Sequence, residues 1–124
     1  MAVFVNAAGQ LGTLTSSRRF KENIEAMGDS SSPIFALRPV TFNYKAEYGG
    51  GGLQYGLIAE EVNEVMPEMT IRDKDGQIET VAYQMLTPML LNEVQKQQRT
   101  IEAQQAEINT LKAQMAAILA KLPM

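Results

Sequence analysis

The chain contains neither cysteine nor histidine. The lack of cysteine excludes disulfides, thiolate metal sites and a cysteine nucleophile, and the lack of histidine excludes a Ser-His triad and the usual zinc ligands. Lys, Asp and Glu are the remaining side chains that could act as a base. Any hydrolytic chemistry must therefore proceed without imidazole, and we expect no metal and no cofactor.

Long apolar runs and a strong net charge are also missing. No stretch approaches the roughly 20 apolar residues that cross a bilayer. The formal net charge of −3 is made of both signs scattered along the chain, so no basic field would attract nucleic acid or an anionic membrane. We expect neither as a partner. A length of 124 residues suits one compact domain with one long extension.

The first residues have a different character from those that follow. In residues 1–15, small and apolar residues alternate with Gly9 and Gly12, which predicts short strands and tight turns at the end of an upstream stalk. Charged residues come next and surround Phe20 and Ile24, four positions apart, which predicts a short helix or turn.

The following segment is rich in turn residues. Residues 28–33 hold glycine, aspartate, proline and three serines, and predict a loop. Alternating apolar residues predict a strand over residues 37–45 with one buried face. The four glycines at 49–52 predict a flexible surface loop. A phosphate-binding loop is the alternative there, but no Gly-Lys-Ser/Thr sequence follows it.

A short helix and a hairpin are predicted next. One apolar face is formed by Ile58, Val62, Val65 and Met66, and Glu60, Glu61 and Glu64 face outward until Pro67 ends the helix. Residues 69–73 and 77–82 flank Lys74-Asp75-Gly76, a hairpin signature. The run from Asp73 to Gly76 is also similar to a calcium loop, but Ile71 and Ala82 occupy its first and twelfth ligand positions, which disfavours calcium.

The C-terminal third predicts one long helix with a heptad repeat. Residues 83–122 are rich in Gln, Glu, Ala, Lys and Leu, and Pro88 falls early enough for the first turns to absorb it. Position a holds Val94, Ile101, Ile108, Met115 and Leu122, and position d holds Leu90, Gln97, Gln104, Leu111 and Ile118. A lone amphipathic helix on a globular core is the alternative, but residues 103–124 extend past anything so small a core could cover.

Repeated Ile at position a, with Leu or Ile at position d, favours three or four strands, and core Gln can fix the register. We therefore predict an α+β chain: a small mixed strand and helix domain followed by a long C-terminal helix that forms a parallel trimeric coiled coil. The predicted divisions are stalk end 1–15, globular domain 16–82 and coiled-coil helix 83–124.

Without His or Cys, the candidate nucleophiles are Ser and Thr, and the strongest nearby base is Lys. Ser16 and Lys21 lie together where stalk-like sequence changes to domain-like sequence. A neutral Lys could take the Ser proton, and burial or the neighbouring Arg18 and Arg19 would favour that neutral form. Spacing alone does not select this pair, because residues five apart on an α-helix point about 140° from each other. Ser16 as a helix cap beside a solvated basic face is the alternative.

Four ordered blocks carry a resemblance over nearly the whole chain. They are Ser-Ser-Arg-Arg-Phe-Lys-Glu-Asn-Ile at 16–24, Leu-Arg-Pro-Val-Thr-Phe at 37–42, Gly-Leu-Ile-Ala-Glu-Glu-Val at 56–62, and Tyr83 with Leu90-Leu91. Together they resemble the endosialidase-type C-terminal intramolecular chaperone domain, a Ser-Lys self-cleaving peptidase family. Its members end phage tail spikes, tail fibres and neck appendages, and related domains occur in bacterial and eukaryotic membrane-associated transcription factors.

The resemblance implies a homotrimeric chaperone that folds an upstream β-rich passenger of the same polypeptide and then releases it. The implied scissile bond joins Thr15 to Ser16, with Ser16 as the nucleophile, Lys21 as the general base and Arg19 as a site-orienting residue. An ester linkage is one route through the reaction. The implied location is a phage virion fibre, released in the host cytoplasm, or a bacterial surface fibre.

This sequence departs from the family at one position, because Ser17 stands where an Asp often follows the motif serine. Ser17 is also a second candidate nucleophile. Two other functions stay open: a structural trimerisation tip that never cleaves, and a receptor- or glycan-binding tip, for which Tyr48 and Tyr55 around the glycine loop are the candidate aromatics. The sequence also leaves open whether the dyad forms within one chain or across the trimer.

Overall fold

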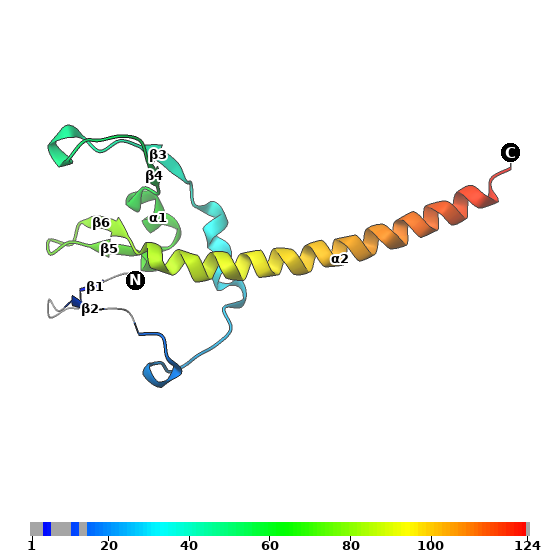
Figure 1. Ribbon diagram of the computed structural model, residues 1–124, viewed down its shortest axis with the longest axis horizontal. Coiled ribbons are helices and arrows are strands. Elements are labelled where there is room, and N and C mark those ends of the chain that lie inside the picture. The colour runs from blue at the N-terminus through cyan, green and yellow to red at the C-terminus, as the bar shows by residue number, and fades with distance from the viewer. Residues whose placement is uncertain (1–3, 6–10, 13–14, 124) are drawn as a thin grey trace.

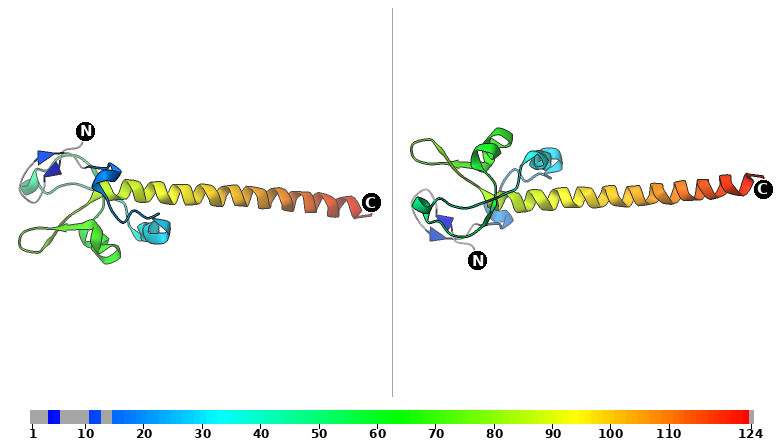
Figure 2. Two further views of the ribbon diagram at one scale, coloured as in Figure 1. Left: turned by 90° about the horizontal axis from the view of Figure 1, so that it is seen from below. Right: turned by 90° about the horizontal axis from the view of Figure 1, so that it is seen from above.

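The chain consists of a small body at one end and one long helix at the other (Figure 1). The computed structural model describes residues 4–5, 11–12 and 15–123. Helix α2, Leu86–Lys121, has 36 residues and a length of about 54 Å at 1.5 Å per residue. In both views of Figure 2 it leaves the body as a single rod. The predicted mixed body followed by a long C-terminal helix is confirmed.

Short elements make up the body. Its strands pair as antiparallel hairpins, and within the described residues five 3₁₀ helices (η) of one to three turns connect the elements. The strands are β1 (Phe4–Val5), β2 (Leu11–Gly12), β3 (Val40–Phe42), β4 (Gln54–Gly56), β5 (Thr70–Arg72) and β6 (Ile78–Val81). The helices are η1 (Arg18–Phe20), η2 (Gly28–Ala36), η3 (Ala46–Tyr48), α1 (Ala59–Val65), η4 (Pro67–Met69) and η5 (Tyr83–Met85). Strand β1 pairs with β2, β3 with β4, and β5 with β6.

A small apolar core forms where α1 packs between η2 and the β5–β6 hairpin. The apolar residues buried in it are Ile34, Val62, Met66, Met69 and Val81. The predicted helix is confirmed, because Val62 and Met66 are buried and the helix ends before Pro67. This core covers only the first turns of α2, through Leu86 and Met89. Among the described residues, no helix is both long and apolar enough to span a bilayer.

The predicted hairpin is also confirmed. Gly76 has a φ of 84°, a conformation that glycine adopts without a steric penalty. The Asp73 carboxylate accepts hydrogen bonds from the backbone amides of Asp75 and Gln77, both at 2.9 Å. The aspartate that made this run similar to a calcium loop therefore closes the turn. Across residues 15–123 and the two described strand pieces before them, no acidic cluster could hold a metal ion.

Two local predictions need correction. The loop predicted at residues 28–33 is wrong, because Gly28–Ala36 forms the 3₁₀ helix η2. Its serines have specific partners: exposed Ser30 donates a hydrogen bond to the carbonyl of Met27, and buried Ser31 donates one to a carboxylate of α2. The strand predicted over 37–45 is shorter than expected: β3 ends at Phe42, and the side chain of Tyr44 is exposed.

Tyr83 ties the beginning of the long helix to strand β4. Its hydroxyl accepts a hydrogen bond from the amide of Leu57 at 2.9 Å and donates to the Leu57 carbonyl at 3.3 Å. A Cβ on Gly56 would lie 2.9 Å from that hydroxyl and 3.2 Å from the ring of Phe42, so any other residue here would displace the tyrosine. The path from β4 into α1 is therefore fixed by the residue that precedes α2.

We predict that Tyr83→Phe lowers the free energy of unfolding by about 1 kcal/mol, because it removes both hydrogen bonds to Leu57. Urea unfolding at one fixed protein concentration measures the change. The matched control is Tyr48→Phe, in the exposed η3 turn, which should leave the unfolding curve unchanged. Equal curves for the two variants would show that the hydroxyl does not stabilise the body.

Candidate functional site

Ser16 and Lys21 meet across a single turn. The ammonium nitrogen of Lys21 lies 2.9 Å from the hydroxyl oxygen of Ser16, in a hydrogen bond that the lysine donates. The two residues lie on either side of η1, which begins at Arg18 and ends at Phe20. The structure therefore brings together the two residues that the sequence predicted as a pair.

The backbone of this turn explains why residues five apart can meet. Ser17 and Lys21 are both extended, with φ and ψ of −64° and 144° and of −125° and 151°. Between them, the amide of Phe20 bonds the carbonyl of Ser17 at 3.0 Å, and the amide of Lys21 bonds the carbonyl of Arg18 at 3.1 Å. One 3₁₀ turn between extended residues folds the chain back on itself, so the divergence expected on an α-helix does not arise.

The surroundings of the pair are open. Ser16, Lys21 and the preceding Thr15 are exposed in the single chain, so the burial expected to favour a neutral lysine is not present within one copy. The Arg19 guanidinium lies 4.6 Å from the centre of the Phe20 ring, in a cation–π contact. A site-orienting role for Arg19 stays a prediction.

This arrangement meets the geometric requirement for proton transfer. A hydroxyl and an amine 2.9 Å apart are within the range over which a positioned base takes a proton. The same distance serves the reverse bond, in which the Ser16 hydroxyl donates to a neutral Lys21 amine. The structure thus places the Ser16 hydroxyl and the Lys21 amine within proton-transfer distance, one residue after Thr15.

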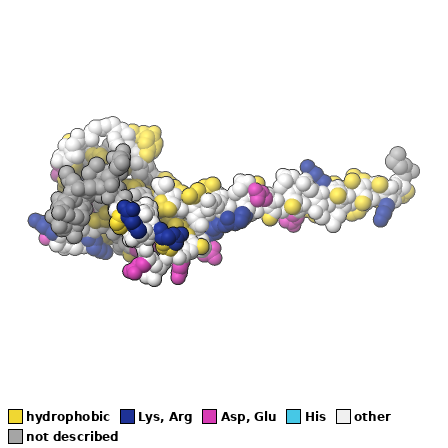
Figure 3. Space-filling view, turned by 60° about the horizontal axis from the view of Figure 1, so that its bottom comes forward, with side chains coloured by type: hydrophobic (Ala, Val, Ile, Leu, Met, Phe, Trp, Pro, Cys, Tyr) yellow, Lys and Arg dark blue, Asp and Glu magenta, His cyan; other side chains and the backbone are white. Residues whose placement is uncertain are grey.

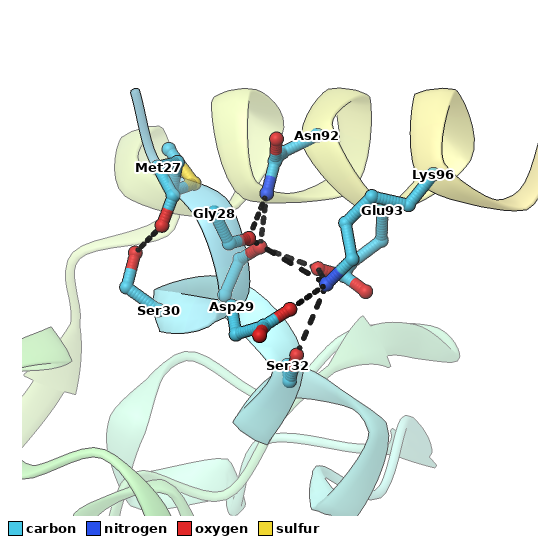
Figure 4. Close-up of polar contacts among 9 residues, drawn as sticks. Met27, Gly28, Asp29, Ser30, Ser32, Asn92, Glu93 and Lys96 are labelled. Atoms are coloured by element: carbon cyan, nitrogen blue, oxygen red, sulfur yellow. Dashed lines mark hydrogen bonds and ion pairs between the residues drawn. The ribbon is translucent and has the colours of Figure 1, made fainter. Parts of the chain in front are cut away.

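A polar latch anchors the chain just after this turn. We use this name for the hydrogen bonds and ion pairs that join η2 to α2 (Figure 4). Its members are Gly28, Asp29, Ser31 and Ser32 on η2, and Asn92, Glu93 and Lys96 on α2. Residues 15–27 lead directly into it, so the latch joins the chain to α2 shortly after the dyad.

Glu93 lies at the centre of the latch and is 5% exposed. The Ser31 hydroxyl donates to it at 2.5 Å, and Lys96 donates at 3.0 Å. The Ser31 hydrogen bond, helped by Lys96, lowers the pKa of Glu93, although burial opposes this shift. The hydrogen bonds to Glu93 and Asp29 raise the pKa of Lys96. Both groups are therefore held charged near neutral pH.

The latch was not predicted from the sequence. Asn92, Glu93 and Lys96 occupy positions f, g and c of the heptad, outside the predicted seam. Their spacing of one, three and four residues places them together on a second face of the helix. The partners on η2 come from a run of three serines beside Asp29. The turn-forming composition of that run predicted a loop instead.

One family model matches the segment that contains the dyad. The family is named Peptidase_S74 and described as chaperone of endosialidase, and the matched residues are 16–71. Residues 16–71 form a chaperone of endosialidase domain. A search of curated proteins found no match to the chain.

The limits of the chaperone of endosialidase domain bear on the site. The match begins at Ser16 and includes Lys21, so the dyad lies at its first residues. It ends at Ile71, before the latch residues of α2 and before Tyr83 and Leu90-Leu91, the fourth block of the resemblance. The first three blocks thus lie inside the domain and the fourth lies outside it.

We predict that the latch makes the protein sensitive to acid. A carboxyl with a lowered pKa stabilises the fold above its ordinary value of 4.5 and loses that contribution as the pH falls through the lowered value. Lys96, with a raised pKa, keeps its contribution below 10.5 and loses it only as the pH rises through the raised value. The free energy of unfolding should therefore fall as the pH drops below about 4.5.

Glu93→Gln should reduce this fall of the free energy of unfolding at acid pH, which we call the acid limb. Urea unfolding from pH 7 to pH 3 measures it. The matched control is Glu61→Gln, because Arg38 also lowers the pKa of Glu61, but in an exposed pair that contributes little. The control should keep most of the acid limb. An identical limb in Glu93→Gln and the unchanged chain would refute a role for the latch.

Proposed function

We propose that this chain is a self-processing chaperone module, which trimerises, assists the folding of an upstream fibre segment and cuts the bond between Thr15 and Ser16. The 2.9 Å contact between Lys21 and Ser16 carries this proposal. It lies at the first residues of a domain whose family is named as a peptidase and described as a chaperone. The turn that makes the contact thus coincides with the predicted boundary between passenger and chaperone.

The proposed reaction uses these two residues alone. Lys21, as the neutral amine, takes the hydroxyl proton of Ser16 while the serine oxygen bonds to the carbonyl carbon of Thr15. The carbon–nitrogen bond to Ser16 then breaks and the proton passes to the leaving nitrogen, which leaves Thr15 joined to the serine oxygen as an ester. Water attacks the ester carbonyl and yields a Thr15 carboxylate, the Ser16 hydroxyl and a new α-amino group.

The surface of α2 supports trimer assembly. The apolar side chains at heptad positions a and d, from Leu90 to Leu122, are 44% to 64% exposed in the single chain. Figure 3 shows apolar side chains recurring along the helix beyond the body. From Gln97 onward, every side chain of the helix described is exposed. A helix with so little tertiary packing is marginal in water, and an uncovered stripe of this length is typical of an interface.

The two aromatic residues that favoured a glycan-binding tip are exposed, as that alternative requires. Tyr48 is 71% exposed and Tyr55 is 79% exposed, on either side of the glycine loop. Tyr55 also lines an apolar groove that reaches α2, which suits contact with protein better than contact with sugar. Self-processing and assembly therefore remain the favoured function, with a non-cleaving tip as the rival.

We predict that the chain purified after folding begins at Ser16 and that Ser16→Ala and Lys21→Ala abolish this cleavage. Each removes one partner of the only proposed proton transfer. Intact-mass spectrometry distinguishes the full chain from the product. Ser17→Ala, the matched control next to the nucleophile, should still be cleaved. An intact wild-type chain that is folded by circular dichroism would leave the non-cleaving tip as the function.

The ester gives a second, chemically distinct test. Hydroxylamine present during folding should capture the Thr15 acyl group as a hydroxamate, because the amine attacks an ester far faster than an amide. Peptide mass spectrometry of residues 1–15 detects that group. A released peptide that carries only a free carboxylate, even at high hydroxylamine concentration, would exclude an ester and favour direct attack by water.

We also predict that Ile108→Asp turns the trimer into monomers, because it places a charge at a central core position of the coiled coil. Ala106→Asp is the matched control, two residues earlier at position f on the outer face, and should remain trimeric. Sedimentation equilibrium measures the mass of each. A wild-type chain that sediments as a monomer or a dimer would contradict the proposed trimer.

A further inference from the structure

An apolar groove of about 650 Å³ opens on the surface of the body beside the start of α2. Ile34 and Leu37 from the η2 region, Val40 of β3, Leu57 before α1, and Leu86 and Leu90 of α2 line it. Leu90 is also the first apolar d position of the heptad repeat. The groove therefore continues directly into the uncovered stripe of α2, and a copy packed on that stripe would lie next to the groove.

The segment that carries the dyad has two large apolar side chains that are about half exposed. Phe20 is 55% exposed and Ile24 is 53% exposed. They lie within residues 16–24, which we call the dyad segment. About half of each side chain is exposed to water, even though Arg19 lies over the Phe20 ring, so each would gain from further burial.

The dyad segment and the groove lie at the same height along the molecule. Figure 1 and both views of Figure 2 show η1 level with the first turns of α2, where Leu86 and Leu90 line the groove. A parallel threefold assembly rotates each copy about a common axis that runs along the coiled coil, without moving the copy along that axis. A segment of one copy therefore meets only those features of the next copy that lie at the same position along the long axis of α2.

The charges on the two surfaces are also complementary. From Ser16 to Ile24 the dyad segment carries three basic residues, Arg18, Arg19 and Lys21, and one acidic residue, Glu22, so its net charge is positive. Helix α1, which follows the groove residue Leu57, carries three glutamates and no basic residue. One of them, Glu61, is already paired with Arg38 at 2.7 Å, so Glu60 and Glu64 are the ones left for a second copy. Contact between them would bring opposite charges together at the rim of an apolar interface.

We propose that Phe20 and Ile24 of one copy dock in the groove of a second copy of this chain. The inference rests on the proposed trimer and names the surface through which the bodies, rather than the helices, join. Docking orders the dyad segment and removes water around Lys21, which favours the neutral amine that the reaction needs. Each copy thereby completes the site of its neighbour.

Cross-linking tests the contact without relying on cleavage. The chain has no cysteine, so an introduced pair reports on one contact only. Ile24→Cys with Thr41→Cys, a polar residue that lines the groove, keeps Phe20 and the apolar walls intact. The pair is introduced into the Ser16→Ala chain, which we expect not to cleave. Isotopically light and heavy chains are mixed, unfolded together and refolded. A short bismaleimide should then give cross-linked peptides that join one light and one heavy chain.

Two controls separate the possible failures. Val94→Cys alone, at position a, should link chains whenever the coiled coil forms. Ile24→Cys with Tyr48→Cys, in the exposed η3 turn, should not link. The docking is overturned if the Ile24→Cys, Thr41→Cys chain forms links only within one chain. It is also overturned if that chain forms no link while Val94→Cys chains do. If Val94→Cys chains fail to link as well, the trimer is wrong and the docking falls with it.

A complementation experiment tests the consequence for cleavage. Phe20→Asp removes the docking residue, and Tyr55→Asp places a carboxylate in the groove at a highly exposed position. Each variant alone should lose most of its cleavage. When the two variants are co-expressed at equal levels, the neighbour that receives a Tyr55→Asp chain is a Phe20→Asp chain, with an intact groove, about half of the time. About half of the Tyr55→Asp chains should therefore be cleaved. Cleavage at the wild-type rate in each single variant, or no recovery on mixing, would contradict docking between copies.

Discussion

The apolar stripe of α2 is the constraint on which the rest of the structure depends. The body buries only a handful of apolar side chains, and it covers the long helix no further than its first turns. A helix of 36 residues whose apolar positions face water gains little from its own chain. The groove beside Leu90 and the exposed Phe20 repeat this pattern in the body. All three are surfaces that a second and third copy would cover.

The polar latch connects this stripe to the chemistry. Glu93 and Lys96 lie on a face of α2 that turns away from the heptad seam and bond to η2, a few residues after the dyad. Pairing the helices would therefore fix the orientation of η2, and with it the point from which the dyad segment departs. Buried polar contacts of this kind contribute specificity of geometry more than net stability. The latch thus fixes the chain a few residues after the dyad, and the proposed apolar docking would hold the dyad segment itself.

Elements defined by their own sequence were predictable. Helix α1, the Asp-Gly hairpin and α2 each follow from local periodicity or turn chemistry, and each was found where expected. The loop predicted at residues 28–33 failed because Ser31 has its partner 62 positions away on α2, which composition cannot reveal. The pairing of Ser16 with Lys21 was not derivable from spacing, since it depends on extended backbone at Ser17 and Lys21. Only the family resemblance selected that pair.

The position of the proposed cut has a physical rationale. The three chains of a β-rich fibre must align before their long-range contacts form, which is a slow step. A coiled coil assists it by raising the local concentration of the chains. If the dyad is complete only when two copies touch, cleavage follows alignment rather than preceding it. Once the module has left, an unfolded passenger would have no such aid to reassemble. The cut then makes unfolding effectively irreversible, so the fibre gains kinetic stability without a single added contact.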